Sequence, residues 1–352
     1  MYSLDDYKVE LLKDSIEKKE MSDLEYFSNY NEYISNSRLK LINPLENGSP
    51  IKYLENESIT TPSLIFGSYI HQLILQPEEF ELIYYEYKPS GKLGLFIEHL
   101  VDNRVNKKQD TETAVRNASI SSNYYANKLS KTLLRTALLK GRQYYKDLYY
   151  NNFSNYTKTP IIVSLKNYQE ITDCMKNFKR SSSYRILNNQ NITHSKENHN
   201  EEAIFAHFKV TLPTKEEVIL PFKGKLDNYS IDPDFDEVIL NDIKTTSHEI
   251  NYFMGQQNPE DNTKWIFGSF QKYHYYRQIA VYMLILQNLI NKPNYKYSAN
   301  ILAIESSGEY NSRVFRISNE YIKLGIKELK NLLCRVAYHT KYGFDQPFNK
   351  YE

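Results

Sequence analysis

The pattern of apolar and polar positions differs between the two halves of the chain. In the first half, apolar residues recur at helical spacing. This predicts helices over Leu64–Gln76, Lys92–Lys108, Tyr124–Tyr150 and Leu165–Phe178. A polar run, Asn188–Asn200, separates this half from a second half in which short apolar runs alternate with turn residues. The chain therefore has a helical N-terminal half followed by a region rich in strands.

The second half predicts one sheet with helices beside it. Alternating runs indicate strands over Ala203–Thr211, Val218–Phe222, Lys223–Ile231 and Glu237–Thr245, which form an antiparallel meander. A long amphipathic helix, two further strands and a last helix follow, over Phe270–Asn291, Tyr295–Glu305, Arg313–Ile317 and Asn319–Tyr338. We therefore expect a mixed α/β (α+β) fold with a central mixed β-sheet flanked by helices.

Composition narrows the class of protein. The chain has 352 residues, of which 41% are hydrophobic and 25% charged, as in globular proteins. No apolar run reaches the roughly 18 residues that a spanning helix needs, and Met1–Asp23 carries acids and lysines in place of an apolar signal core. We expect a soluble cytoplasmic protein without a membrane partner. Two cysteines, Cys174 and Cys334, are too few for an iron–sulfur cluster, so oxygen and histidine must hold any metal.

The net charge of +1 conceals a lopsided distribution. Met1–Glu57 has twelve acids and seven bases, whereas Arg104–Lys158 has eleven bases and three acids. This basic stretch, which includes Lys128, Lys131 and Arg135 and has interleaved tyrosines, suits a polyanion. The alternative is a solvated helical face whose lysines only improve solubility.

Two carboxylates and a lysine form the candidate site. Strand geometry places Asp242 and Lys244 on one side of a strand, while Ile243 points the other way. Asp227 lies near the end of the preceding strand, and a hairpin through the turn at residues 232–234 would bring the two acids together. Converging carboxylates repel unless a hard cation such as Mg²⁺ lies between them, and the lysine could then orient or deprotonate a water. A surface ion pair is the alternative interpretation of these residues.

These residues also resemble a known family. Gly224–Asp227 followed by Asn241–Thr246 resembles the acid and the acid-x-Lys of the PD-(D/E)XK nuclease superfamily, in particular its RecB-type and RecE-like phage exonuclease branch (exodeoxyribonuclease VIII-like). Further segments resemble that branch's motifs in the same order: Ser37–Lys40, Leu64–His71 with Pro77–Phe80 after it, and Tyr276–Tyr282. The resemblance covers about residues 35 to 282 and implies a restriction-endonuclease-like core.

The resemblance implies a role for each matching residue. Asp227, Asp242 and the backbone carbonyl of Ile243 would hold the metal, and Lys244 would act on the attacking water. His71 would approach the same ion from its helix; otherwise it is a core histidine bonded to a carbonyl.

Two more positions come from the same resemblance. Gln278 and Tyr282 would contact DNA or brace the site, with a buried polar stripe as the alternative. Either Glu201 or Glu202 would supply an additional acid.

The resemblance also implies a function. It indicates a Mg²⁺-dependent DNA exonuclease, with Mn²⁺ able to substitute, that degrades duplex ends from 5′ to 3′ and leaves 3′ single strands for phage recombination or repair. A homo-oligomeric ring and a single-strand annealing protein as partner would fit this activity. The expected organisation is an acidic segment, 1–34, that could be an interaction arm or a packed helix, followed by one nuclease domain, 35–352, with a helical insertion at 92–190. Alternatives are an endonuclease or single-strand nuclease of the same fold, and a catalytically silent DNA-binding or interaction module.

Overall fold

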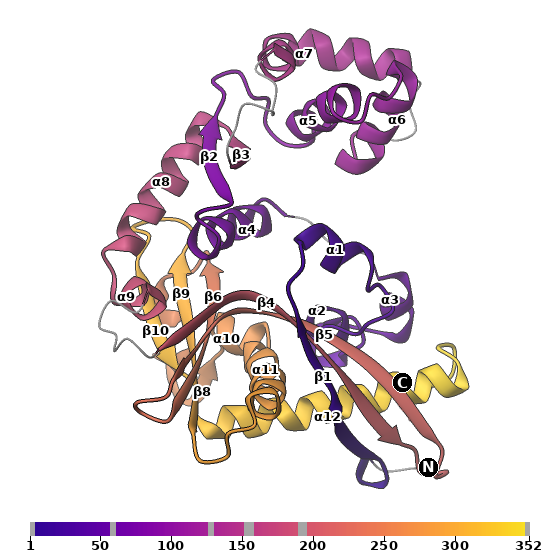
Figure 1. Cartoon of the computed structure of the whole chain (residues 1–352), viewed down its shortest axis with the longest axis vertical. Helices are drawn as coiled ribbons and strands as arrows, with labels where there is room; N and C mark the ends of the chain where they lie inside the picture. Colours follow the sequence, from indigo (N-terminus) through magenta and orange to yellow (C-terminus); the bar gives the residue numbers. More distant parts are fainter. Residues whose placement is uncertain (1–3, 57–60, 126–129, 151–157, 189–195, 349–352) are drawn as a thin grey trace. The chain divides into compact units, whose positions relative to one another are not determined.

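The computed structural model describes residues 4–56, 61–125, 130–150, 158–188 and 196–348 (Figure 1). The chain divides into two compact units. The first consists of Met1–Gly67 and Lys176–Glu352, and the second of Ser68–Met175. Among the described helices, none has the length and apolar character that crossing a membrane requires.

A six-stranded mixed sheet forms the centre of the first unit (Figure 1). Its strands lie in the order β1-β4-β5-β6-β9-β10. Their bounds are β1 Lys8–Lys19, β4 Glu197–Thr211, β5 Glu217–Asp232, β6 Glu237–Thr246, β9 Lys296–Glu305 and β10 Ser312–Arg316. Neighbours are antiparallel except β6 and β9, which are parallel. The sheet and its flanking helices confirm the predicted fold class.

Two long helices pack against this sheet. They are α11 (Tyr275–Ile290) and α12 (Asn319–Tyr342), which also contact each other. Ile279 of α11, Leu333 of α12 and Ile301 of β9 are fully buried in one hydrophobic core. The periodicity of 3.6 in the helices and 2 in the strands brings these apolar side chains to one interface. The sheet is therefore a rigid support for residues at its strand ends.

Shorter elements complete the first unit. They are η1 (Leu4–Asp6), α1 (Asp23–Ser28), α2 (Asn36–Lys40), η2 (Pro44–Glu46), α3 (Pro50–Glu55), α9 (Ser182–Asn188), η4 (Ile250–Tyr252), β7 (Gln256–Asn258), β8 (Asp261–Ile266) and α10 (Ser269–Lys272). Strands β7 and β8 form a separate antiparallel hairpin.

The second unit is mainly helical. Helices α5 (Lys92–Val105), α6 (Thr111–Ser122) and α7 (Ser130–Tyr150) surround their own apolar core. Strands β2 (Phe80–Tyr84) and β3 (Thr159–Val163) pair in parallel. Two helices contain the unit boundaries: α4 (Pro62–Leu75) runs from the first unit into the second, and α8 (Leu165–Lys179) runs back.

The structure corrects the interpretation of the N-terminal segment. It is neither an arm nor a single helix: it contains strand β1, which pairs with β4 at the sheet edge, followed by the short helix α1. The strand has a bulge between Leu12 and Glu17, where the Ser15 hydroxyl donates to the Leu12 carbonyl and accepts from the His207 amide. Charged residues along an edge strand discourage pairing with other chains. The many charged residues of this segment interrupt the apolar alternation from which a strand is predicted.

Other boundaries also differ from the sequence prediction. The polar run partly belongs to β4, since the strand begins at Glu197, while residues 189–195 lie outside the described residues. The two strands predicted on either side of Phe222 and Lys223 form the single strand β5. The predicted long helix is broken into α10 and α11, because His274 adopts a left-handed conformation with φ of 50°.

Candidate functional site

Strands β5 and β6 separate at the candidate site. Their last pair in register is Asn228 with Asn241, so Asp227 and Asp242 follow as the next facing positions. At this point the Ile243 amide donates to the Asp227 carboxylate at 2.7 Å. This bond takes the place of a regular strand-to-strand hydrogen bond and fixes the Asp227 side chain between the two strands. Both predicted acids therefore lie at the same strand opening.

Lys244 lies beside both acids. Its Nζ forms an ion pair with Asp242, which is only 1% exposed, and donates to the Ile243 carbonyl at 3.3 Å. Burial alone would lower the pKa of Lys244, but the Asp242 and Asp227 carboxylates outweigh it and raise that pKa above its usual range. For Asp227 the effect of burial dominates and raises the pKa of the carboxyl, against the opposing effects of Lys244 and the Ile243 amide. Lys244 is therefore an ammonium at neutral pH.

A third acid faces Asp227 from β4. Asn200 pairs with Asn228 and Glu202 with Leu226, so Glu201 lies opposite Asp227. Carboxylate oxygens of Glu201 and Asp227 lie within 4.8 Å of each other. Burial and the Asp227 charge raise the pKa of Glu201 to about 7. Glu201 also has a φ of 54°, an uncommon value for a non-glycine residue, and such strain occurs preferentially at functional sites.

The Glu202 carboxylate makes its hydrogen bonds away from these acids. It accepts hydrogen bonds from Lys18 Nζ at 3.0 Å and from the Tyr229 hydroxyl. Of the two glutamates considered from the sequence, the structure brings Glu201 to the acids and leaves Glu202 in contact with β1 and β5.

Lys225, which the sequence analysis did not single out, limits the negative charge of this cluster. Its Nζ forms ion pairs with Glu201 at 2.5 Å and with Asp23 of α1. Lys225 is two residues before Asp227 on the same strand, a spacing that could have identified it. Asp23 comes from a distant acidic segment, and no feature of the local sequence distinguished it from the neighbouring acids.

Helix α11 covers the site with two polar side chains. Gln278 Nε2 donates to Asp242 Oδ1 at 3.2 Å and to the Tyr282 hydroxyl at 3.4 Å. The Tyr282 ring lies directly against Gly224, where an added Cβ would come within 2.6 Å of the ring. The predicted pair therefore contacts the acid site, and Gly224 supplies the space that Tyr282 occupies.

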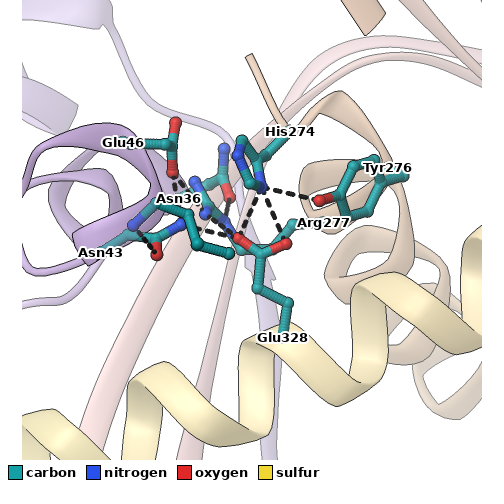
Figure 2. Close-up of polar contacts among 8 residues, drawn as sticks. Asn36, Asn43, Glu46, His274, Tyr276, Arg277 and Glu328 are labelled. Carbon is teal, nitrogen blue, oxygen red and sulfur yellow. Dashed lines mark hydrogen bonds and ion pairs between the residues drawn. The ribbon is translucent and has the colours of Figure 1, made fainter. Parts of the chain in front are cut away.

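A buried ion network holds the start of α11 (Figure 2). Arg277, 1% exposed, donates to Glu46 and Glu328 at 2.6 Å each and to Asn36 at 2.9 Å. Ligand atoms of Glu46, His274 and Glu328 lie close enough together to hold a metal ion. The Arg277 guanidinium already bonds to both carboxylates, however, so it supplies the positive charge there. We interpret this network as structural.

His71, Lys131 and Arg135 lie on helices of the second unit. His71 is on α4, four residues after Gly67, and therefore on the same face of that helix. In the first unit, Gly67 approaches β6 so closely that an added Cβ would lie 2.6 Å from Thr245 Oγ1. Lys131 and Arg135 are exposed on α7 and line a surface hollow with Arg142 and Lys146; Lys128 lies outside the described residues.

The donor set fits a hard divalent cation. Asp227, Asp242 and Glu201 offer carboxylate oxygens and Ile243 offers a carbonyl, which are the ligands that Mg²⁺ and Mn²⁺ prefer. Burial raises the pKa of the Asp227 carboxyl, and burial together with the Asp227 charge raises that of Glu201, so ionising these groups carries a cost. A bound cation would remove that cost.

Comparison with known proteins identifies the class. A protein-family model described as "PDDEXK-like domain of unknown function (DUF3799)" matches residues 35–345. No curated protein matches the chain. A crystal structure of a protein from Eubacterium rectale named "Putative exonuclease" aligns with a TM-score of 0.47 and 11% identity, covering 94% of this chain and 89% of that one.

The mixed sheet flanked by helices is that of a PDDEXK-like nuclease fold, which confirms the fold class expected from the sequence. The chain belongs to the family of the PDDEXK-like domain of unknown function.

Proposed function

We propose that the protein is a metal-dependent deoxyribonuclease that hydrolyses phosphodiester bonds at the opening between β5 and β6. The observation that carries this proposal is the arrangement of Asp227, Asp242 and Lys244 around the Ile243 peptide, with Glu201 opposite. Buried carboxylates with raised pKa values are typical of functional sites, and this set matches what phosphodiester hydrolysis with a metal requires.

Each residue has a chemical task in this proposal. Asp227, Asp242 and the Ile243 carbonyl would hold Mg²⁺, for which Mn²⁺ could substitute. When bound, the metal would stabilise negative charge on the phosphate and lower the pKa of its water. Lys244 is protonated, so it would orient the attacking water and the phosphate by donating hydrogen bonds. Gln278 would hold Asp242 in the orientation that the metal needs.

Two further assignments belong to the same proposal. His71 would be an additional ligand, as the resemblance of the Leu64–His71 segment implies. Lys128, Lys131 and Arg135 would contact the DNA backbone; the exposure of Lys131 and Arg135 beside two other bases supports this.

The finer description rests on the resemblance of the sequence motifs to RecE-like phage exonucleases. We propose 5′-to-3′ digestion of duplex ends, which leaves 3′ single strands for recombination or repair in the host cytoplasm. A homo-oligomeric ring and an annealing protein as partner would serve this activity.

The first test is a cleavage gel. End-labelled linear DNA and covalently closed circular DNA are incubated with Mg²⁺ or with chelator. We expect metal-dependent shortening of the linear DNA from its 5′ ends and an intact circle. A cut circle would indicate an endonuclease, degradation of single strands alone a single-strand nuclease, and no cleavage a catalytically silent module.

Neighbouring glutamates provide a matched control for the metal site. Glu201→Gln should reduce cleavage at limiting Mg²⁺ by tenfold or more, because it removes a carboxylate opposite Asp227. Glu202→Gln changes an adjacent side chain that bonds to Lys18 and Tyr229, and it should leave cleavage nearly unchanged. Equal activity of the two variants would contradict the role proposed for Glu201.

A further inference from the structure

A partly exposed aromatic path begins at the proposed catalytic lysine. Lys244 Nζ lies 5.2 Å from the centroid of the Tyr275 ring. The Tyr275 ring lies 5.7 Å from the Tyr273 ring, and Tyr273 is 41% exposed. Tyr275 also stacks on the buried Phe253. The path therefore leads from the acid site to the surface within the first unit.

Two exposed lysines flank the outer ring of this path. Lys40, the last residue of α2, has its Nζ 5.8 Å from the Tyr273 centroid. Lys272, the last residue of α10, has its Nζ 5.6 Å from the same centroid. The two ammonium groups come from segments far apart in the sequence and meet at one tyrosine.

The turn that presents Tyr273 is held firmly (Figure 2). His274 follows Tyr273, is 8% exposed and has a φ of 50°. Its Nδ1 lies 2.9 Å from a Glu328 carboxylate oxygen and 2.7 Å from the Tyr276 hydroxyl. Arg277 bonds to Glu328 and to Asn36 of α2, the helix that carries Lys40. The same network thus fixes the turn that carries Tyr273 and the helix that carries Lys40.

Such a surface matches the chemistry of a single DNA strand. An exposed aromatic ring stacks on a nucleobase whatever its sequence, and lysines pair with the phosphates on either side. Because both lysines are exposed, a base can displace an ammonium group from the ring and leave it free to bind a phosphate. A duplex offers no unpaired base to such a ring.

We propose that Tyr273, Lys40 and Lys272 form a subsite that stacks one unpaired base of a single DNA strand directly outside the active site. This inference rests on the proposed nuclease function. The subsite would hold the strand that enters or leaves the pocket after the duplex end has opened.

The test measures binding of a fluorescent single-stranded oligodeoxynucleotide to the full chain by anisotropy, with chelator present to prevent cleavage. Tyr273→Ala should weaken binding by about fivefold or more, the effect of losing one stacked base. Tyr273→Phe and Tyr273→Trp should keep it within about twofold. Tyr342→Ala is the matched control, because Tyr342 is 40% exposed on α12, and it should leave binding unchanged.

Salt dependence gives a second readout. Lys40→Met should reduce the slope of log affinity against log salt by about 0.7, the value for one phosphate contact on a single strand. If circular dichroism shows that Tyr273→Ala does not fold, Tyr273→Leu replaces it as the variant that lacks the aromatic ring.

Four results would overturn the subsite: wild-type protein that does not bind the strand, equal binding by Tyr273→Ala, a loss in Tyr273→Phe as large as in Tyr273→Ala, or an equal loss in Tyr342→Ala. Failure of the nuclease proposal is a separate result, because it would show as absence of Mg²⁺-dependent cleavage in a wild-type chain that still binds single strands through Tyr273.

Discussion

Arg277 is the residue whose replacement should most clearly weaken the support of the site. Its side chain is 1% exposed and contacts carboxylates of Glu46 and Glu328 that are 4% and 10% exposed. Arg277→Met would leave both carboxylates buried without their cation. Removing one partner of a buried ion pair costs about 3 to 5 kcal/mol, mostly because the remaining charge is uncompensated.

Urea unfolding can measure this loss. Trp265 is the only tryptophan and lies in the first unit, so its fluorescence follows that unit. With a slope of roughly 3 kcal/mol per molar urea, the midpoint should fall by about 1 to 1.7 M. Arg316→Met, at an exposed position of β10, should change stability by about 0.5 kcal/mol or less.

The double variant separates charge from packing. Glu328→Gln in the Arg277→Met background removes one of the two uncompensated charges and should recover part of the loss, giving a non-additive cycle. Two results would refute the view that this network holds the start of α11 by charge. One is a loss of unfolding free energy below about 1 kcal/mol in Arg277→Met, and the other is strict additivity of the Arg277→Met and Glu328→Gln effects.

Three other outcomes are expected. Gly224→Ala should cost about 1 to 3 kcal/mol in urea unfolding, because its Cβ would meet the Tyr282 ring at 2.6 Å; unchanged stability would contradict this packing. Burial lowers the pKa of His339 in the folded state, so the free energy of unfolding should decrease as the pH is lowered below the unfolded pKa of about 6.5. The decrease should reach up to about 1.4 kcal/mol at pH 5.5, and His339→Gln should make it smaller. Lys131→Glu with Arg135→Glu should weaken duplex binding and reduce its salt slope by roughly 0.9 per contact, whereas an unchanged slope would place α7 away from DNA.

The sequence predicted most of the sheet because its central strands contain short, strongly apolar runs that end at turn residues. Val238 and Leu240 of β6 and Ile301 of β9 are buried, and each stands in such a run. It missed β1 because an edge strand needs only one apolar face and carries charge on the other. It also split β5, since the Lys-Gly-Lys at its centre has the composition of a turn but pairs with β4 throughout.

The candidate site was predictable where its residues are local and unpredictable where they are not. Asp227, Asp242 and Lys244 follow from strand spacing and a hairpin, and the structure brings them together. The choice between Glu201 and Glu202 depends on the register of β4 against β5, which no local pattern specifies. Lys225 and Asp23 meet through tertiary contacts between segments 202 residues apart.

Calorimetric titration of the full chain with Mg²⁺, and with Mn²⁺ as a tighter probe, tests the metal site most directly. The account predicts saturable binding to the wild-type protein and a loss of tenfold or more in Asp242→Asn, which removes one ligand charge. Asp236→Asn, in the exposed turn of the same hairpin, should bind as the wild-type protein does. Wild-type protein that binds neither ion, or Asp242→Asn that binds them equally well, would contradict the assignment of these acids to a metal.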